Sequence, residues 1–323
     1  MEKKQYKDLA TYRVAIVGDV HLASRSPRFR IDNYFDSLIN KLDYIYKNND
    51  IILYLGDLFD SPILEAKSLY KYINLLKYYF TQKKVSFSIV GNHDISSYNI
   101  QKLNESSLGL LFTVGLIKPL KRIYIHNILI DGMEFIDETS KKPTVKPNPK
   151  LNYKYDSVLL GHYFYNCGLD MDYSLTDEII EKMNYKYIFL GHDHKPYPIK
   201  NIGKTSLYRG GSICRNTRND FNLVRQPSYY QLIINQDGIA DIVYNEIPAL
   251  LPNEIFLDTS LKSYDNELNF ITDLKELVNS ITITQDTNTK KYTIKNSLEE
   301  LQAPNHVVEF LSARYNENNI LLK

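Results

Sequence analysis

Five short apolar segments of this chain each end in a glycine that is followed by Asp, Asn or His. Residues 51–55 form the clearest of them, because this apolar run is too short for a helix and indicates a buried strand. Ligands collect at the carboxyl ends of strands in open α/β sheets, so we expect Asp57 to face a crevice. The motifs are Gly18-Asp19-Val20-His21, Gly56-Asp57, Gly91-Asn92-His93-Asp94, Gly161-His162 and Gly191-His192-Asp193-His194.

These side chains suit the hydrolysis of a phosphoester at two metal ions. Two divalent ions roughly 3.5–4 Å apart can clamp a phosphodiester, hold a hydroxide that attacks phosphorus in line, and stabilise the leaving oxygen. Mixed oxygen and imidazole ligation without thiolate favours manganese, with iron or zinc as alternatives, over calcium or structural zinc. His93 is left free beside the ions, where it could protonate the departing sugar oxygen. Asp57 is the natural bridging ligand, with Asp19, His21 and His194 for one ion and Asn92, His162 and His192 for the other.

Composition limits the class of protein but not its substrate. A chain of 323 residues with 43% hydrophobic content can bury a large core plus a small appendage. A net charge of +1 neither favours nor excludes nucleic acid, because a basic groove can coexist with acidic surfaces. The polar start of the chain and the lack of a long apolar run predict no signal peptide and no membrane contact. With 2 cysteines, Cys167 and Cys214, a cytoplasmic protein is expected, in a bacterial or phage-infected cell if the Tyr-rich composition reflects an AT-rich gene.

Along the chain, strands and helices alternate. Residues 31–49 and 66–80 have apolar side chains at helical spacing, and we expect Ser61 and Pro62 to cap the second helix. The segments 123–130 and 133–136 flank Asp131-Gly132, which predicts a β-hairpin turn there. A helix over about 176–184 and strands at 205–208, 229–234 and 239–247 complete the expected core.

The expected fold is an α/β protein with two domains. Residues 1–248 form the catalytic domain, and Pro248 and Pro252 bracket a boundary. Residues 249–323 form a small α+β module, with helices over 268–281 and 307–315 and a strand pair between them.

The five motifs, in this order, resemble those of the calcineurin-like metallophosphoesterases over roughly residues 13–212. The resemblance implies an αββα sandwich of two sheets and the metal roles given above. Within that superfamily, residues 56–61, residues 187–196 and Gly211-Ser212 look most like the SbcD-type DNA repair nucleases. Those nucleases work with a coiled-coil ABC-type ATPase and carry a small capping domain. The resemblance therefore implies DNA as substrate, an SbcC-type ATPase as partner, and a C-terminal module in the capping position, with homodimer formation left open.

Two departures from the family pattern limit this comparison. Many of these nucleases have a histidine shortly after the bridging aspartate, where this chain has Asp60, and the chain has little room for an ATPase-binding tail. Protein phosphatases of the superfamily have Asp-Arg-Gly after the second motif and Glu in the third. This chain has Phe59-Asp60-Ser61 and Asp94, which disfavours that branch.

The sequence leaves several interpretations open. A phosphodiesterase of small nucleotides, a metal-holding subunit that docks an ATPase or a DNA end, and a metal-free scaffold compete with the nuclease hypothesis. Scattered cations at Lys195, Arg209, Arg215 and Arg218 could line a phosphate track, although solvation is the more ordinary role. Tyr163 and Tyr165 could stack on a base, but core packing is favoured. His126 and His306 are interpreted as ordinary core or surface residues.

Overall fold

The computed structural model describes residues 5–6, 10–135, 156–165 and 174–257. The chain divides into two compact units, Met1–Asp258 and Thr259–Lys323, and all described residues belong to the first. The C-terminal α+β module, the basic loop at 141–150, Cys167 and His306 lie outside the described residues. The proposed domain boundary therefore stays a prediction.

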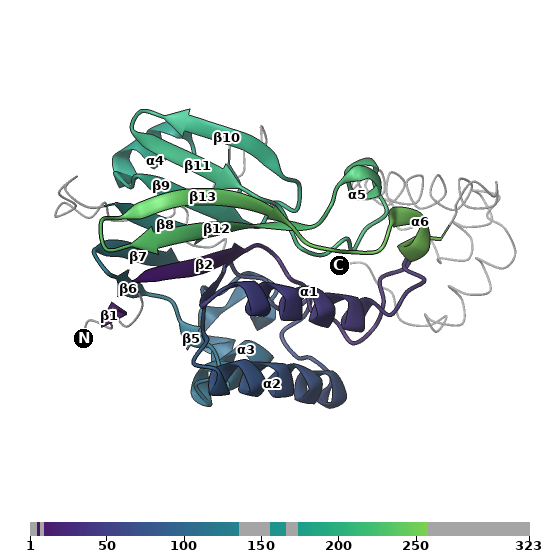
Figure 1. The fold of residues 1–323 in the computed structure, drawn as a ribbon. Helices are drawn as coiled ribbons and strands as arrows, with labels where there is room; N and C mark the ends of the chain where they lie inside the picture. Colours follow the sequence, from purple (N-terminus) through teal and green to yellow (C-terminus); the bar gives the residue numbers. More distant parts are fainter. Residues whose placement is uncertain (1–4, 7–9, 136–155, 166–173, 258–323) are drawn as a thin grey trace, which may run out of the picture. The chain divides into compact units, whose positions relative to one another are not determined.

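The described residues form two mixed sheets (Figure 1). In the six-stranded sheet the order is β13-β12-β2-β3-β4-β5, with β2 to β5 parallel. Because β2, β3 and β4 run parallel, their carboxyl ends lie at one edge of the sheet. The strands are β2 Thr11–Val17, β3 Ile51–Tyr54, β4 Val85–Ser88, β5 Lys118–Pro119, β12 Ser228–Asn235 and β13 Ile239–Glu246.

The second sheet has seven strands among the described residues, in the order β1-β6-β7-β8-β9-β11-β10. Strands β7, β8, β9 and β11 are parallel, while β10 pairs antiparallel to β11 at the edge. This sheet consists of β1 Gln5–Tyr6, β6 Arg122–Ile125, β7 Ile128–Met133, β8 Ser157–His162, β9 Tyr187–Gly191, β10 Tyr197–Ile202 and β11 Thr205–Arg209.

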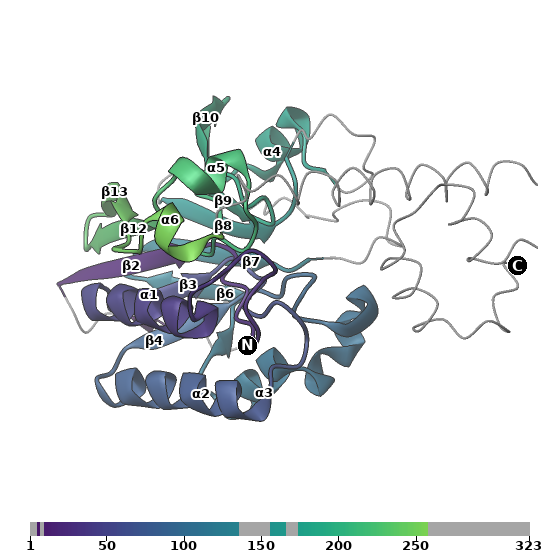
Figure 2. The same cartoon turned by 90° about the vertical axis from the view of Figure 1, so that its right-hand side faces the viewer.

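Three apolar layers hold this unit together. Side chains of both sheets, such as Leu53 and Leu160, form the cluster between them. A second cluster packs the six-stranded sheet against α1 Tyr34–Asn48, α2 Ala66–Thr81 and α3 Ser107–Thr113. A third packs the other sheet against α4 Asp177–Met183. Helices thus cover the two outer faces (Figures 1 and 2), which confirms the expected αββα sandwich.

A side chain caps the start of α1, whereas no side chain caps the start of α2. In α1 the side chain of Asn33 accepts a hydrogen bond from the Asp36 N–H at 3.1 Å, which caps the helix. The expected cap of α2 at Ser61 and Pro62 is wrong, because α2 begins after Glu65, and the Ser61 hydroxyl donates to the Ile63 carbonyl. Short helices not anticipated are η1 Ser96–Tyr98, η2 Ile100–Glu105, α5 Asp220–Val224 and α6 Pro252–Ile255.

The antiparallel pair β6–β7 exists, but its turn is not at Asp131-Gly132. The register pairs Ile125 with Ile128, so the chain turns at His126 and Asn127, with His126 in the left-handed region at φ 48°. Asp131 lies inside β7 and forms two hydrogen bonds with Arg122, at 2.6 and 2.7 Å. Pairing of Asp131 and Gly132 with Leu159 and Leu160 of β8, together with burial of β7, outweighs the local turn preference of an Asp-Gly pair.

Residues 252–257 belong to the first unit and pack against its residues 29–31. The Ile31 N–H donates to the Ile255 carbonyl at 3.0 Å, and the Leu257 N–H donates to the Phe29 carbonyl at 2.9 Å.

Among the described residues, no helix combines the length and the apolar character that a membrane span requires.

Candidate metal centre

The predicted ligands come from the carboxyl ends of strands in both sheets. Asp19 and His21 follow β2, Asp57 follows β3, and Asn92 and His93 follow β4. From the other sheet, His162 is the last residue of β8, and His192 and His194 follow β9. The structure brings all eight of these predicted residues into one neighbourhood, through the contacts described below.

Backbone conformation at these strand ends is unusual. Asp19, His21, Asp57 and His192 have φ values of 26°, 48°, 47° and 85°, a region that residues with a Cβ rarely occupy. Such strain is typical of functional sites, where surrounding structure holds a side chain in a required direction.

Gly91 shows why glycine precedes the ligands. A Cβ at Gly91 would lie 2.2 Å from Asp57 Oδ1 and 2.3 Å from the Asp57 nitrogen. Because real Cβ atoms do not approach so closely, glycine is required for the β4 loop to pack against Asp57.

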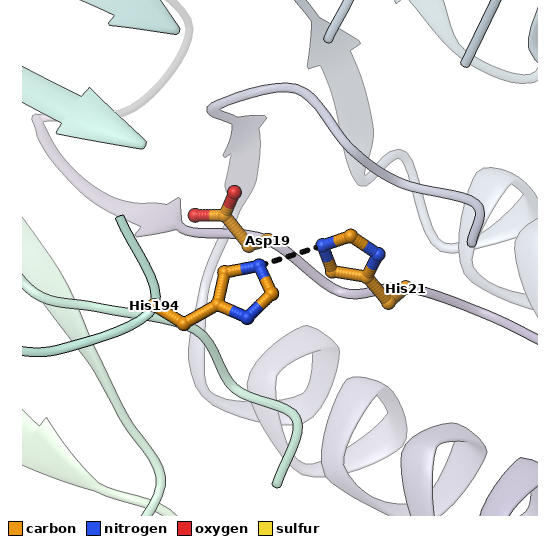
Figure 3. A group of neighbouring side chains, drawn as sticks. All are labelled: Asp19, His21 and His194. Atoms are coloured by element: carbon orange, nitrogen blue, oxygen red, sulfur yellow. Dashed lines mark hydrogen bonds between the residues drawn. The ribbon is translucent and has the colours of Figure 1, made fainter. Parts of the chain in front are cut away.

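The first cluster contains Asp19, His21 and His194 (Figure 3). The Nε2 atoms of His21 and His194 lie 2.9 Å apart. Asp19 Oδ1 accepts a hydrogen bond from the His192 N–H at 2.9 Å, whereas its buried Oδ2 has no hydrogen-bond partner among the described residues. A buried carboxylate oxygen without a donor, beside two converging imidazole nitrogens, suits a bound cation.

The second cluster contains Asp57, His162 and His192. His162 Nε2 lies 3.3 Å from Asp57 Oδ2 and 3.1 Å from His192 Nδ1. The other nitrogen of the His162 ring, Nδ1, lies 2.7 Å from the Leu55 carbonyl, so it donates there and directs Nε2 at the cluster. Asn92 Oδ1 is 3.0 Å from the same Nε2 and joins this cluster.

Asp57 connects the two clusters. Its Oδ2 atom, in contact with His162, is also 3.6 Å from His21 Nε2. Its Oδ1 atom accepts a hydrogen bond from the His93 N–H at 2.8 Å, which fixes the carboxylate. A carboxylate in this position can reach ions in both clusters.

Within each close imidazole pair, one ring binds a proton and the other does not. Burial opposes charging of His21, but the hydrogen bond to Asp60 and nearby carboxylates raise the pKa of His21 to about 10. Burial likewise opposes charging of His162, yet the Asp57 charge and hydrogen bond raise the pKa of His162 to about 9. Burial and the His162 charge lower the pKa of His192 to about 3, and burial lowers the pKa of His194. A proton or a metal ion between the two rings of each pair would remove the repulsion between their facing nitrogen lone pairs.

Asp60, which the sequence marks only as a departure from a family pattern, contacts two of the candidate site residues. Its Oδ1 atom lies 3.2 Å from His21 Nδ1, and its backbone carbonyl is 2.9 Å from His93 Nδ1. These contacts leave His21 Nε2 directed at the first cluster and hold the exposed His93 ring beside it. The one available signal was a carboxylate three residues after Asp57 on the same loop.

Asp94 is buried behind the ligands and shapes the loop. Its two oxygens accept hydrogen bonds from the Phe59 N–H at 3.1 Å and the Gly91 N–H at 2.9 Å. Burial, with the Asp57 charge as a second cause, raises the pKa of Asp94 to about 7.

The segment after the last motif supports the first cluster. The Ser212 N–H donates to the His194 carbonyl at 3.2 Å, and the Ile213 N–H donates to the Gly18 carbonyl at 3.3 Å. Buried cationic side chains hold this segment: Lys41 donates to the Ile213 carbonyl at 3.1 Å and Arg30 to the Arg215 carbonyl at 2.8 Å.

Arg215 is therefore neither solvated nor part of a phosphate track, because its side chain is 1% exposed and its guanidinium donates to the Leu250 carbonyl. Tyr163 and Tyr165 are buried, as core packing requires. His126 is also buried, against the Tyr12 ring.

Comparison with known proteins agrees with this geometry. The family model described as calcineurin-like phosphoesterase matches residues 12–196, more than half of the chain. The chain is 26% identical over 251 residues to the DNA double-strand break repair protein Mre11 of Archaeoglobus fulgidus, covering 70% of this chain and 55% of that protein. It thus spans about half the length of this curated relative.

Among solved structures, TT1561 of Thermus thermophilus is similar with a TM-score of 0.46 and 10% identity, over 74% of this chain and 100% of the other. A dimetal phosphatase from Danio rerio is similar with a TM-score of 0.45 and 10% identity, over 73% and 99% of the two chains. The chain belongs to the calcineurin-like phosphoesterase family, metal-dependent phosphoesterases with a dinuclear divalent site, for which these two clusters provide candidate ligands.

Proposed function

We propose that this protein is a dinuclear-metal-dependent nuclease that hydrolyses phosphodiester bonds in DNA, in repair, recombination or replication. The observation that carries the proposal is Asp57 Oδ2, which lies between His21 of one cluster and His162 of the other. Similarity to a DNA double-strand break repair protein supports DNA as the substrate class.

We assign one ion to Asp19, His21 and His194 and the other to Asn92, His162 and His192, with Asp57 shared. The donors are oxygen and imidazole nitrogen without thiolate, which suits manganese, or iron or zinc. Bound divalent ions would supply an activated water nucleophile and neutralise charge on the phosphate. Asp60 orients His21 through Nδ1, and the Leu55 carbonyl orients His162 in the same way.

His93 is the proposed general acid. Its Nδ1 atom contacts the Asp60 carbonyl at 2.9 Å, so the ring is held while its other nitrogen stays available. The ring is exposed, and its centroid lies 4.8 Å from that of His21, beside the first cluster. A proton on Nε2 can pass to the sugar oxygen as the phosphorus–oxygen bond breaks.

We also propose a cytoplasmic location and a coiled-coil ABC-type ATPase as a partner, with a homodimer as an alternative assembly. The resemblance of residues 56–61 and 187–196 to SbcD-type nucleases supports this partner. A binding test with purified ATPase would decide it.

The experiment that tests the function is manganese-dependent degradation of end-labelled single-stranded and double-stranded DNA, beside a small bis-phosphodiester. Wild type and Asp57→Ala are compared, with Lys186→Ala as a control, because Lys186 precedes β9 at the end of that strand opposite to the ligands. We expect DNA cleavage by wild type and Lys186→Ala and none by Asp57→Ala.

Other outcomes identify the competing functions. Cleavage of the small ester alone would show a small-substrate phosphodiesterase and contradict the nuclease assignment. Activity that is unchanged in Asp57→Ala would show that the centre does not catalyse the reaction, as expected of a metal-holding binding subunit.

A further inference from the structure

Beside the metal centre, three cationic and two aromatic side chains alternate in one stack, which we call the cation–aromatic ladder. Its members, in order, are Lys195, Tyr197, Arg209, Tyr165 and Lys200. The Lys195 ammonium is 5.5 Å from the centre of the Tyr197 ring, and the Lys200 ammonium is 5.0 Å from that of Tyr165. The Arg209 guanidinium lies between the two rings, at 3.9 and 4.9 Å.

The ladder begins at the metal centre and continues to a sheet edge. Lys195 directly follows the candidate ligand His194, so their Cα atoms are about 3.8 Å apart. Tyr197 and Lys200 belong to the edge strand β10, and Arg209 ends the neighbouring β11. A strand of nucleic acid that left the metal centre along this edge would pass the ladder.

Lys195 and Arg209 have no acidic partner among the described residues. Lys200 is paired with Asp177 at 2.9 Å, whereas neither Lys195 nor Arg209 forms an ion pair in the described part of the chain. The Nε atom of Arg209 is buried without a hydrogen-bond partner there. A buried donor on a charged group is costly when unpaired, which points to an anionic ligand.

The two tyrosines prepare Arg209 for such a ligand. Contacts with both rings restrict the guanidinium, so less side-chain entropy is lost when it binds an anion. The edge of a guanidinium matches two phosphate oxygens. Tyr165 is 8% exposed, so its ring holds a cation and is not open to stack on a base.

We propose that Lys195 and Arg209 bind backbone phosphates of the nucleotides that flank the scissile bond, and so select polynucleotides over small phosphodiesters. This inference rests on the proposed nuclease function and specifies its substrate class. Contacts to phosphate carry no base identity, so this selection is independent of sequence.

The test measures binding and turnover separately. Binding of a fluorescent single-stranded oligonucleotide to the full chain is followed by anisotropy in chelator, which prevents cleavage, at several salt concentrations. Lys195→Ala and Arg209→Ala should each weaken binding about tenfold. The slope of log K against the logarithm of the salt concentration should also become less steep by about 0.7 in each variant. This is the value for one lost phosphate contact on a single strand. Hydrolysis of the small bis-phosphodiester by the metal-loaded variants should equal that of wild type.

A control variant and the exposed position of Lys195 keep the test decisive. Lys186→Ala removes a lysine that also lies over a tyrosine ring, 5.1 Å from the Tyr187 centroid, but at the start of β9, and should bind like wild type. Lys195 is exposed, so Lys195→Ala tests the proposal even if Arg209→Ala fails to fold.

Different experimental results would overturn the ladder proposal and the proposed nuclease function. If wild type cuts DNA but both variants bind DNA with unchanged affinity and salt dependence, the ladder proposal alone is overturned. If wild type hydrolyses the small ester but neither binds nor cuts DNA, both the proposed nuclease function and the ladder proposal are overturned.

Discussion

At each cluster, two imidazole nitrogens lie within hydrogen-bond distance, 2.9 Å for His21 and His194 and 3.1 Å for His162 and His192. Neutral imidazoles could not both present a lone pair at such a distance without repulsion. The raised pKa values of His21 and His162 favour bound protons at these positions in the metal-free protein. Metal ions must displace them.

The first prediction concerns proton release. Because the pKa values of His21 and His162 are raised to about 10 and about 9, both rings are protonated at pH 7, and metal binding should release about two protons. Metal affinity should therefore rise with pH and level off above about 10. Calorimetric titration with manganese in two buffers of different ionisation heat measures the release.

Asp60→Asn provides the matched variant for this titration. It removes the carboxylate charge that raises the pKa of His21, so fewer protons should be released. Its manganese affinity should also fall about 10–100-fold, the usual effect of losing the carboxylate that orients a ligating histidine. Equal proton release by wild type and Asp60→Asn would contradict the assigned role of Asp60.

The second prediction separates His93 from the ligands. His93→Ala should keep both metal ions, because His93 lies outside the two four-residue ligand sets proposed above. Turnover should fall about 10²–10⁴-fold, as expected for the loss of a general acid. Metal content by elemental analysis and kcat on DNA check this, and loss of metal from the variant would reject His93 as the acid.

At the scale of elements, the site depends on how loops after neighbouring parallel strands pack together. The β4 loop contacts Asp57 after β3 through Gly91, and Asp94 joins the two loops by hydrogen bonds to the Phe59 and Gly91 N–H groups. The ligands are thus held by backbone packing as well as by side-chain contacts.

The third prediction tests that packing. Gly91→Ala would place a methyl group 2.2 Å from Asp57 Oδ1, so the loop must shift and the variant should lose about 1–3 kcal/mol of stability together with most of its metal affinity. Thermal unfolding and manganese titration measure both effects.

Gly115→Ala is the control for that experiment. No atom lies within 4 Å of a Cβ built at Gly115, but its φ of 73° should cost about 1–2 kcal/mol. Its metal affinity should be unchanged. If Gly91→Ala bound manganese as well as Gly115→Ala, the close approach of the two loops would not be needed for the site.

At the scale of the whole described unit, both clusters take candidate ligands from both sheets. His194 of the seven-stranded sheet meets Asp19 and His21 of the other, and His162 and His192 meet Asp57. Bound ions would join the two sheets at the carboxyl ends of their strands, in addition to the apolar layer between them.

The fourth prediction is that chelation destabilises the entire first unit. A ligand at a hundredfold excess over its Kd stabilises the native state by about 2.7 kcal/mol for each site. At about 2–4 °C per kcal/mol, removal of one ion should lower Tm by about 5–10 °C. Calorimetry with manganese and with chelator measures the change. Asp57→Ala should show little difference between the two conditions, and an equal Tm in wild type would argue against ions that join the sheets.

Several features were predictable from local sequence. Apolar runs that end in glycine, such as residues 51–56, form strands whose ends present ligands, since burial and the freedom of glycine act within a few residues. The helices at 34–48 and 66–81 followed from the spacing of their apolar residues. The eight candidate site residues could be named for the same reason, because each lies at or just after the end of a recognisable strand.

Other features required contacts between distant parts of the chain. Asp131 stays inside β7, away from the turn at His126. It pairs there with Leu159 of β8 and accepts a hydrogen bond from the Tyr185 hydroxyl. Arg215 is buried where Arg30 and Leu250 meet it. Asp60 contacts His21 and His93, and Arg209 contacts two tyrosine rings. His21 and His194 are 173 residues apart. The sequence by itself therefore determined which residues are candidates for the chemistry, whereas the tertiary structure decided which of them lie together, because that depends on packing between the sheets.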